Sequence, residues 1–146
     1  MFKEGCDLFM ANIIYNRAKK NLMNGTYDLD NDTFKVMLVY QAYTPNADTN
    51  LVASDVSNEI TGTGYTAGGR ALSGLSVSQD NTNNKGVWDA ADVIWASSSI
   101  SAYGAVIYDT TAASALVCYF DFGAYKVSAT GTFTIAWNAA GLISLA

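Results

Sequence analysis

The stretch GTGYTAGG, residues 62–69, is the most glycine-dense part of the chain, and glycine-rich loops are one way in which proteins bind phosphate. A P-loop requires Lys and then Ser or Thr directly after its last glycine, with a strand before the loop and a helix after it. Here Gly69 precedes RALSGLSV, which alternates as a strand does and offers phosphate no helix N-terminus. We therefore expect these glycines to provide positive-φ or closely approached backbone where the chain enters a strand.

Two groups of aspartates have residue types suited to metal binding or hydrolysis. The segment DLDND, residues 28–32, matches the start of an EF-hand calcium loop, but Thr33 stands where that loop requires glycine. Alternating aspartates before a strand more often form a turn with side-chain hydrogen bonds to the backbone, and we expect such a turn here. Asp89 and Asp92 have the residue types of a glycosidase pair. Nothing around them favours that interpretation over turn residues at the start of a strand.

The chain contains no histidine, which removes the commonest general base, the commonest metal ligand and every histidine-containing triad. The two cysteines, Cys6 and Cys118, are far apart and match no metal-binding spacing. Their small number is typical of buried thiols in a protein made in a reducing cytoplasm, and a single disulfide is the alternative. We therefore predict a protein that is not an enzyme and that uses no metal or cofactor.

Charge is scarce: charged residues make up 14% of the 146 residues, while 50% are hydrophobic. So little charge in so apolar a chain predicts that a partner covers part of the surface. The net charge of −5 and the lack of clustered cations beyond residues 17–20 argue against nucleic acid as a partner. No apolar run reaches the roughly 18 residues of a membrane span, and acids near the N-terminus argue against a signal peptide.

The segment of residues 7–24 is the best helix candidate. One apolar face repeats at intervals of three and four residues, comprising Leu8, Ala11, Tyr15, Ala18 and Leu22. Asp7 is a suitable N-cap, and Asn24-Gly25 is a C-terminal stop. A second apolar set around Ile13 and Ile14 indicates that the helix is buried on more than one side, either against its own domain or against a neighbour.

From about residue 30 to residue 146 the pattern is that of strands. Strand-like segments, bounded by turn residues, recur at spacings of roughly 10 to 15 residues without a long helix between them. They are FKVMLVYQAY, RALSGLSVSQD, VWDAADVIWAS, YGAVIYD, ALVCYFDFG, GTFTIAW and LISLA. We predict a single mainly β domain over residues 1–146, with an antiparallel β-sandwich or barrel-like body and one N-terminal α-helix. The long polar connection after the first strand is expected to hold a short helical turn near Ser54 to Asn58.

Aromatic side chains are the remaining candidates for binding. Trp88, Trp95 and Trp137, with several tyrosines, have the composition of a sugar-stacking platform, as in carbohydrate-binding modules. The same residues are enriched in cores and subunit interfaces, and their alternation with Val and Ile favours that interpretation. The candidate interface residues are Phe9, Tyr15, Tyr65, Arg70 and Trp88.

The order of segments resembles that of small virion proteins of tailed bacteriophages. An N-terminal helix ending in glycine leads into DTFKVML, then YTPN, then EITGTGYTAGG. DAADVIW, GAVIYD, YFDFG and a closing FTIAW with GLISL follow in that order. The resemblance covers nearly the whole chain, and the order is more specific than any one motif.

This resemblance implies a structural protein with no catalytic residues, of the capsid cement or decoration type. Such a protein is assembled in the host cytoplasm and binds the major capsid protein on the outer surface of the head. Symmetry favours a homo-oligomer, either a trimer or a dimer. A tail, neck or fibre-attachment component of the virion is the alternative, and a carbohydrate-binding module is the alternative of another class.

Overall fold

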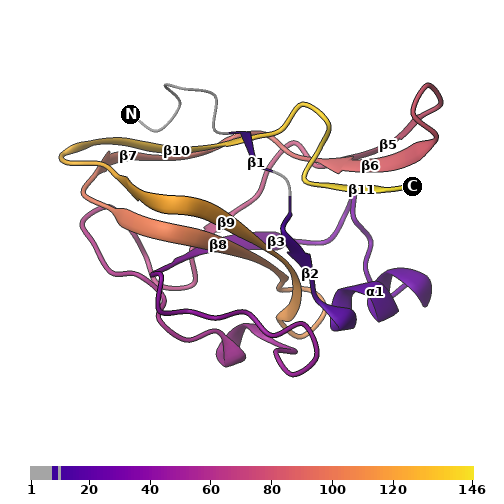
Figure 1. The fold of residues 1–146 in the computed structure, drawn as a ribbon, viewed down its shortest axis with the longest axis horizontal. Coiled ribbons are helices and arrows are strands. Elements are labelled where there is room, and N and C mark those ends of the chain that lie inside the picture. The colour runs from indigo at the N-terminus through magenta and orange to yellow at the C-terminus, as the bar shows by residue number, and fades with distance from the viewer. Residues whose placement is uncertain (1–7, 10) are drawn as a thin grey trace.

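The computed structural model describes residues 8, 9 and 11–146, which form mainly β-structure (Figure 1). The helical elements are α1 (Asn16–Met23) and a 3-10 turn, η1 (Ala53–Asp55). The strands are β1 (Leu8–Phe9), β2 (Ile13–Ile14), β3 (Phe34–Val39), β4 (Arg70–Ala71), β5 (Ser76–Asp80), β6 (Lys85–Asp89), β7 (Val93–Ser98), β8 (Ser101–Asp109), β9 (Ala115–Val127), β10 (Gly131–Trp137) and β11 (Ile143–Leu145). The predicted fold class is confirmed.

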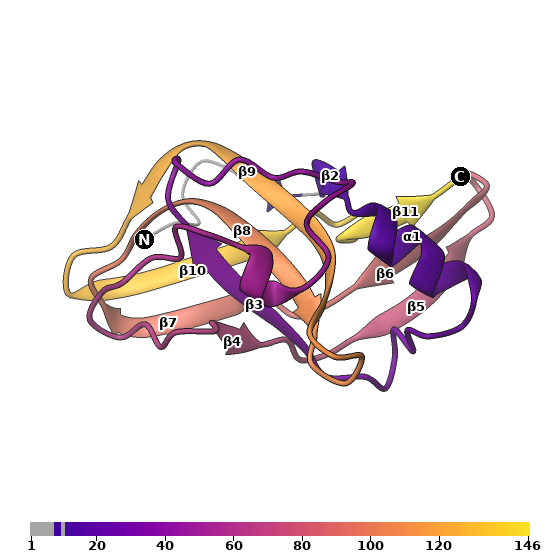
Figure 2. The same cartoon turned by 90° about the horizontal axis from the view of Figure 1, so that it is seen from below.

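The strands form three sheets with the orders β2-β9-β8-β3-β4, β1-β10-β7 and β11-β6-β5. Every pairing is antiparallel except that of β1 with β10. The β1-β10-β7 sheet lies over the five-stranded sheet in a sandwich-like arrangement (Figure 1). The β11-β6-β5 sheet extends toward one end of the molecule, where α1 also lies (Figures 1 and 2).

Strand β3 is buried on both faces, which explains why its two alternating sets of side chains are both apolar. Phe34, Val36 and Leu38 belong to the main core between the sheets. Met37 and Val39 face the opposite way, into a smaller core formed by Tyr15, Met37, Val39, Tyr43, Val106, Tyr108, Leu116 and Tyr119. Ala53 of η1 and Val56 pack against this smaller core, so the long connection after β3 covers the outer face of the sheet.

The predicted helix over residues 7–24 is wrong in its first half, because α1 begins only at Asn16. Ile13 and Ile14 instead form β2 and pair with β9. Both residues satisfy the helical spacing, but β-branched side chains fit a strand, and pairing with β9 satisfies backbone groups that a frayed first turn would leave open. Asp7, the expected N-cap, lies outside the described residues.

The stop at Asn24-Gly25 is confirmed, since α1 ends at Met23 and Gly25 has a φ of 73°. The helical turn expected near residues 54–58 is present as η1, slightly earlier. The segment RALSGLSVSQD is divided into β4 and β5, which belong to different sheets. The division falls at Gly74, whose φ of 61° breaks the extended backbone.

The prediction for the glycine stretch, positive-φ or closely approached backbone at the entry to a strand, is confirmed. It leads directly into β4, and Gly69 has a φ of 77°. A Cβ atom on Gly69 would overlap the carbonyl group of Val36 in the neighbouring strand β3 and lie 2.7 Å from Met37 Cα. The stretch is therefore a structural passage in which the backbone runs against β3.

Candidate functional site

The aspartates of residues 28–32 form the expected turn. Asp28 Oδ1 accepts hydrogen bonds from the backbone N–H groups of Asp30 and Asn31, both at 3.2 Å. Asp32 Oδ2 accepts the N–H of Asp28 at 2.8 Å. The pKa of Asp28 is lowered, chiefly by the hydrogen bond from the side-chain amide of Asn31. Within the described residues, no three His, Cys, Asp or Glu side chains gather as metal ligands would.

Asp109, at the end of β8, is a buried carboxylate that the sequence analysis did not single out. Its Oδ1 accepts hydrogen bonds from the N–H groups of Thr111 and Ala112, at 2.7 and 3.1 Å, while its Oδ2 is buried without a hydrogen-bond partner. Burial is the largest cause that raises the pKa of Asp109 to about 6, and the neighbouring Asp32 carboxyl adds to it. The carboxyl group therefore holds the turn after β8 through these two hydrogen bonds, while its burial destabilises the ionised carboxylate.

This shift predicts a pH-dependent stability. The pKa of Asp109 is higher in the folded chain than in the unfolded chain. Its stabilising contribution to the free energy of unfolding is therefore complete below about pH 4 and is lost as the pH rises through about 6. Asp109→Asn keeps an acceptor for the two N–H groups and carries no charge. We expect it to raise Tm at pH 7 by about 2–4 °C, on the order of 1 kcal/mol, and to give no gain at pH 4.

Thermal unfolding followed by circular dichroism from pH 4 to pH 7 measures this difference. The matched control is Asp121→Asn, an exposed aspartate whose Oδ1 also accepts a backbone N–H, that of Gly123 at 2.7 Å. A Tm difference between Asp109→Asn and the wild type that stays constant over this pH range would contradict the assignment.

Asp89 and Asp92 also act as turn residues. Asp89 Oδ1 accepts the N–H of Ala90 at 2.9 Å, and Asp92 Oδ1 accepts the N–H of Trp137 at 3.1 Å. The second bond connects the turn between β6 and β7 to the end of β10. Asp92 lies in that turn, directly before β7, as expected, whereas Asp89 is the last residue of β6.

The three tryptophans are core residues, with exposed fractions of 2% for Trp88, 3% for Trp95 and 5% for Trp137. The indole N–H groups of Trp88 and Trp137 donate to the backbone carbonyls of Leu29 and Ala91, both at 3.0 Å. The interpretation as core is therefore confirmed, and these rings are not available as a sugar-stacking platform.

Two of the five candidate interface residues are corrected by their burial. Tyr15 is fully buried, and its hydroxyl lies 2.7 Å from that of Tyr43. Trp88 is buried as described above, so neither side chain is available to a partner. Both were chosen because large aromatics are enriched at interfaces, but the same property fills cores.

The other three candidates lie in different settings. Tyr65 is half-buried, donates to Glu59 Oε1 at 2.7 Å and accepts the N–H of Leu38 at 3.0 Å, so it anchors the glycine stretch. Burial raises its pKa. Arg70 is exposed in β4, at an edge of the five-stranded sheet. The backbone of Phe9 is in β1, and its side chain lies outside what the structure describes.

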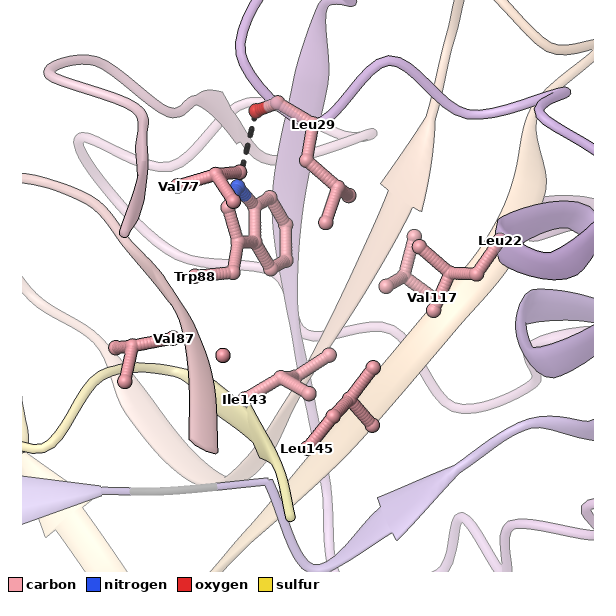
Figure 3. Close-up of a pocket in the computed structure, with 9 residues that line it drawn as sticks. Leu22, Leu29, Val77, Val87, Trp88, Val117, Ile143 and Leu145 are labelled. Atoms are coloured by element: carbon pink, nitrogen blue, oxygen red, sulfur yellow. Dashed lines mark hydrogen bonds between the residues drawn. The ribbon is translucent and has the colours of Figure 1, made fainter. Parts of the chain in front are cut away.

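An apolar hollow lies between α1 and the β11-β6-β5 sheet (Figure 3). It has two adjoining parts, of about 90 and 370 Å³, which share Leu22 and Leu145. The smaller part is lined by Leu22, Leu29, Val77, Gly86, Val87, Trp88, Val117, Ile143 and Leu145. The larger part is lined by Ile14, Lys19, Leu22, Met23 and Leu145. We call the two parts together the α1–β11 groove.

The groove exists because the apolar face of this sheet is only partly covered. Trp88 fills the inner end, whereas Gly86, opposite Leu145 and Gln79 in the register, has no side chain to fill the outer end. The rim is formed by apolar side chains that remain in solvent: Met23 is 89% exposed and Leu145 57%. An uncovered apolar surface of this kind marks a contact site for another molecule.

The groove was not predicted from the sequence. Its lining residues come from β2, α1, the turn after it, the β5–β6 hairpin, β9 and β11, and no pattern within one segment shows that these will meet. A local sign of an exposed apolar surface was Met23. It is an apolar residue directly before the helix stop, where no later residue of α1 can cover it.

A second group of exposed apolar side chains lies at the far end of β9. Val127 is 59% exposed and Tyr125 is 45% exposed, and the ring of Tyr125 meets that of Tyr103 edge-on at 5.3 Å. We call these three residues the β9-end patch. The end of β9 and the groove lie at opposite ends of the molecule (Figures 1 and 2).

Comparison with known proteins found no matching family model, no matching curated protein and no matching solved structure. In the part of the chain that the structure describes, no helix is long and apolar enough to cross a membrane. Cys118 is buried with a free thiol whose pKa burial raises, and Cys6 lies outside the described residues.

Proposed function

We propose that the protein is a non-enzymatic structural component of a tailed-bacteriophage virion, a capsid cement or decoration protein. In this proposal it binds the major capsid protein on the outside of the head and stabilises the shell. The observation that carries the proposal is the presence of two separate exposed apolar surfaces at opposite ends of one β-body. The resemblance of the segment order to small virion proteins supports the same proposal.

A cement protein acts by burying surface at joints between capsomers, where the pressure of packaged DNA pulls subunits apart. Each Å² of apolar surface removed from water contributes about 25 cal/mol, so contacts that are individually weak add up when repeated over a shell. Such a protein needs at least two contact surfaces, one for the shell and one for a neighbour. The net charge of −5 disfavours contact with DNA.

We assign the contact with the shell to the β9-end patch. Its tyrosines offer flat amphipathic rings of the type enriched in protein interfaces, and Val127 adds an exposed aliphatic side chain beside them. Because the Val127 side chain is already mostly in solvent, changing it costs little folding free energy. A loss of binding can therefore be separated from a loss of structure.

Val127→Glu is expected to weaken rebinding to capsids stripped of the protein by at least about 10-fold, because it puts a charge into an apolar contact. Its Tm should stay within about 2 °C of the wild type, as for most surface substitutions. Co-sedimentation of purified protein with stripped capsids measures the binding. Ser78→Glu, which adds the same charge at an exposed strand position in the β11-β6-β5 sheet, is the matched control and should rebind normally. Normal rebinding by Val127→Glu would overturn the assignment of the patch.

A further inference from the structure

We infer that the carboxylates of Asp32 and Asp109 together bind a divalent cation, and that calcium is the cation that fits them best. The site lies where the turn before β3 meets the turn after β8. The inference goes beyond the proposed function, because it concerns what holds two turns of the fold together, whether or not the protein binds a capsid. It also departs from the sequence-based expectation that the chain uses no metal.

The backbone around the two turns brings the two carboxyl groups together. The C=O of Thr33 accepts the N–H of Thr110 at 2.9 Å, and the N–H of Thr33 donates to Thr111 Oγ1 at 3.0 Å. Asp32 directly precedes Thr33, and Asp109 directly precedes Thr110. The two carboxyl groups are therefore neighbours across the junction, close enough for the charge of one to act on the other.

The Asp109 carboxyl has an oxygen that the described residues leave without a partner. The side chain is 0% exposed, and Oδ1 accepts two backbone N–H groups, whereas Oδ2 is buried and accepts no hydrogen bond. Buried charges in proteins are paired or coordinate metals, because removing a bare carboxylate oxygen from water is costly. This oxygen points toward a ligand that the protein atoms do not supply.

The neighbouring Asp32 carboxylate makes a cation the ligand that the site requires. Its Oδ2 accepts the N–H of Asp28 at 2.8 Å, a bond that holds the Asp32 side chain in the turn. Among the described residues, no Lys or Arg side chain forms an ion pair with Asp32 or Asp109. Two adjacent carboxylates repel each other unless a proton or a cation lies between them. A proton neutralises one of the two charges, whereas a divalent cation neutralises both.

Calcium suits these two carboxylates better than magnesium does. It accepts oxygen ligands in flexible geometry and completes its shell with water, whereas Mg²⁺ demands a near-ideal octahedron. Asp32 is half-buried, so water can reach a cation beside it. The site is not an EF-hand, because the Asp28 carboxylate bonds within its own turn. With two protein carboxylates we expect weak binding, with Kd on the order of 10⁻⁴–10⁻³ M.

Thermal unfolding of the full chain at pH 7, followed by circular dichroism in EDTA and in CaCl₂ at constant ionic strength, is the first test. We expect calcium at ten times its Kd to raise Tm by about 3–5 °C, and MgCl₂ at the same concentration to raise it less. Isothermal titration with CaCl₂ should give one site per chain.

Three variants locate the cation. Asp32→Asn and Asp109→Asn should each lose the calcium-dependent rise in Tm, because each leaves one carboxylate at the site. In EDTA, Asp109→Asn should be more stable than the wild type at pH 7, as predicted above, and calcium should cancel that advantage. Asp30→Asn is the matched control, since it removes the same charge from an exposed side chain of the same turn. It should keep the full rise.

Three results would overturn the inference. An unchanged wild-type Tm in calcium would mean that the two carboxyl groups share only a proton. A rise of the same size in Asp109→Asn would place the cation elsewhere. A rise lost as fully in Asp30→Asn as in Asp32→Asn would mean that calcium only screens an acidic turn. None of these measurements involves capsids, so the cation site and the proposed function can fail separately.

Discussion

Gly69→Ala is expected to prevent folding, or to lower the free energy of unfolding by more than about 4 kcal/mol, a large part of the 5–15 kcal/mol that a domain has. Two costs add. The φ of 77° is unfavourable for any residue with a side chain, and the new Cβ would overlap the Val36 carbonyl group. Val36 cannot retreat, because β3 is held between β4 and β8 in the five-stranded sheet.

Substitutions at two other glycines distinguish the cost of the positive φ from the cost of the overlap with Val36. Gly25 has a similar φ of 73° with no atom within 4 Å of an added Cβ, so Gly25→Ala should cost only the strain of about 1–2 kcal/mol. Gly131 has no positive φ and its nearest atom would be 3.7 Å away, so Gly131→Ala should change stability by less than about 0.5 kcal/mol. Urea denaturation of the three variants measures the order. A Gly69→Ala variant as stable as Gly25→Ala would contradict the close approach to β3.

Trp88→Ala is expected to lower the free energy of unfolding by about 3–5 kcal/mol, the usual cost of removing a large buried aromatic. Trp88 is 2% exposed, and its ring meets that of Phe34 at 4.9 Å. Its N–H bond to the Leu29 carbonyl also holds the acidic turn against the β11-β6-β5 sheet. The substitution therefore removes core packing and loosens the inner end of the groove together.

Trp88→Phe retains an aromatic ring but leaves the Leu29 carbonyl without its donor, so it should cost less, about 1–3 kcal/mol. Ile94→Ala, at an apolar side chain of β7 that is 48% exposed, is the control for apolar loss at the surface and should cost under about 1 kcal/mol. Urea denaturation with fluorescence or circular dichroism detection measures all three. Unchanged stability in Trp88→Ala would return Trp88 to the interface residues that the sequence suggested.

Most of the β-body was predictable because its signals are local. The apolar runs GAVIYD, ALVCYFDFG and GTFTIAW, each bounded by turn residues, predict strands that the structure has as β8, β9 and β10. The glycine stretch was also predictable, since the need for positive φ is a property of each residue's own backbone.

The errors arose where two local interpretations were equally good and a distant partner decided between them. Ile13 and Ile14 fit a helical stripe and a strand alike, and the edge of β9 decides for the strand. RALSGLSVSQD has strand-like residues on both sides of Gly74 and was predicted as one segment, yet β4 pairs with β3 and β5 pairs with β6. The groove was not predictable for the same reason, because it is built from segments that only the tertiary fold brings together.

Cryo-electron microscopy of the intact virion tests the central claim most directly, because it locates the protein without relying on any variant. The account predicts density that fits this β-fold on the outer surface of the head, at the joints between capsomers. Density confined to the portal, neck or tail would contradict the cement function and favour the tail or neck alternative.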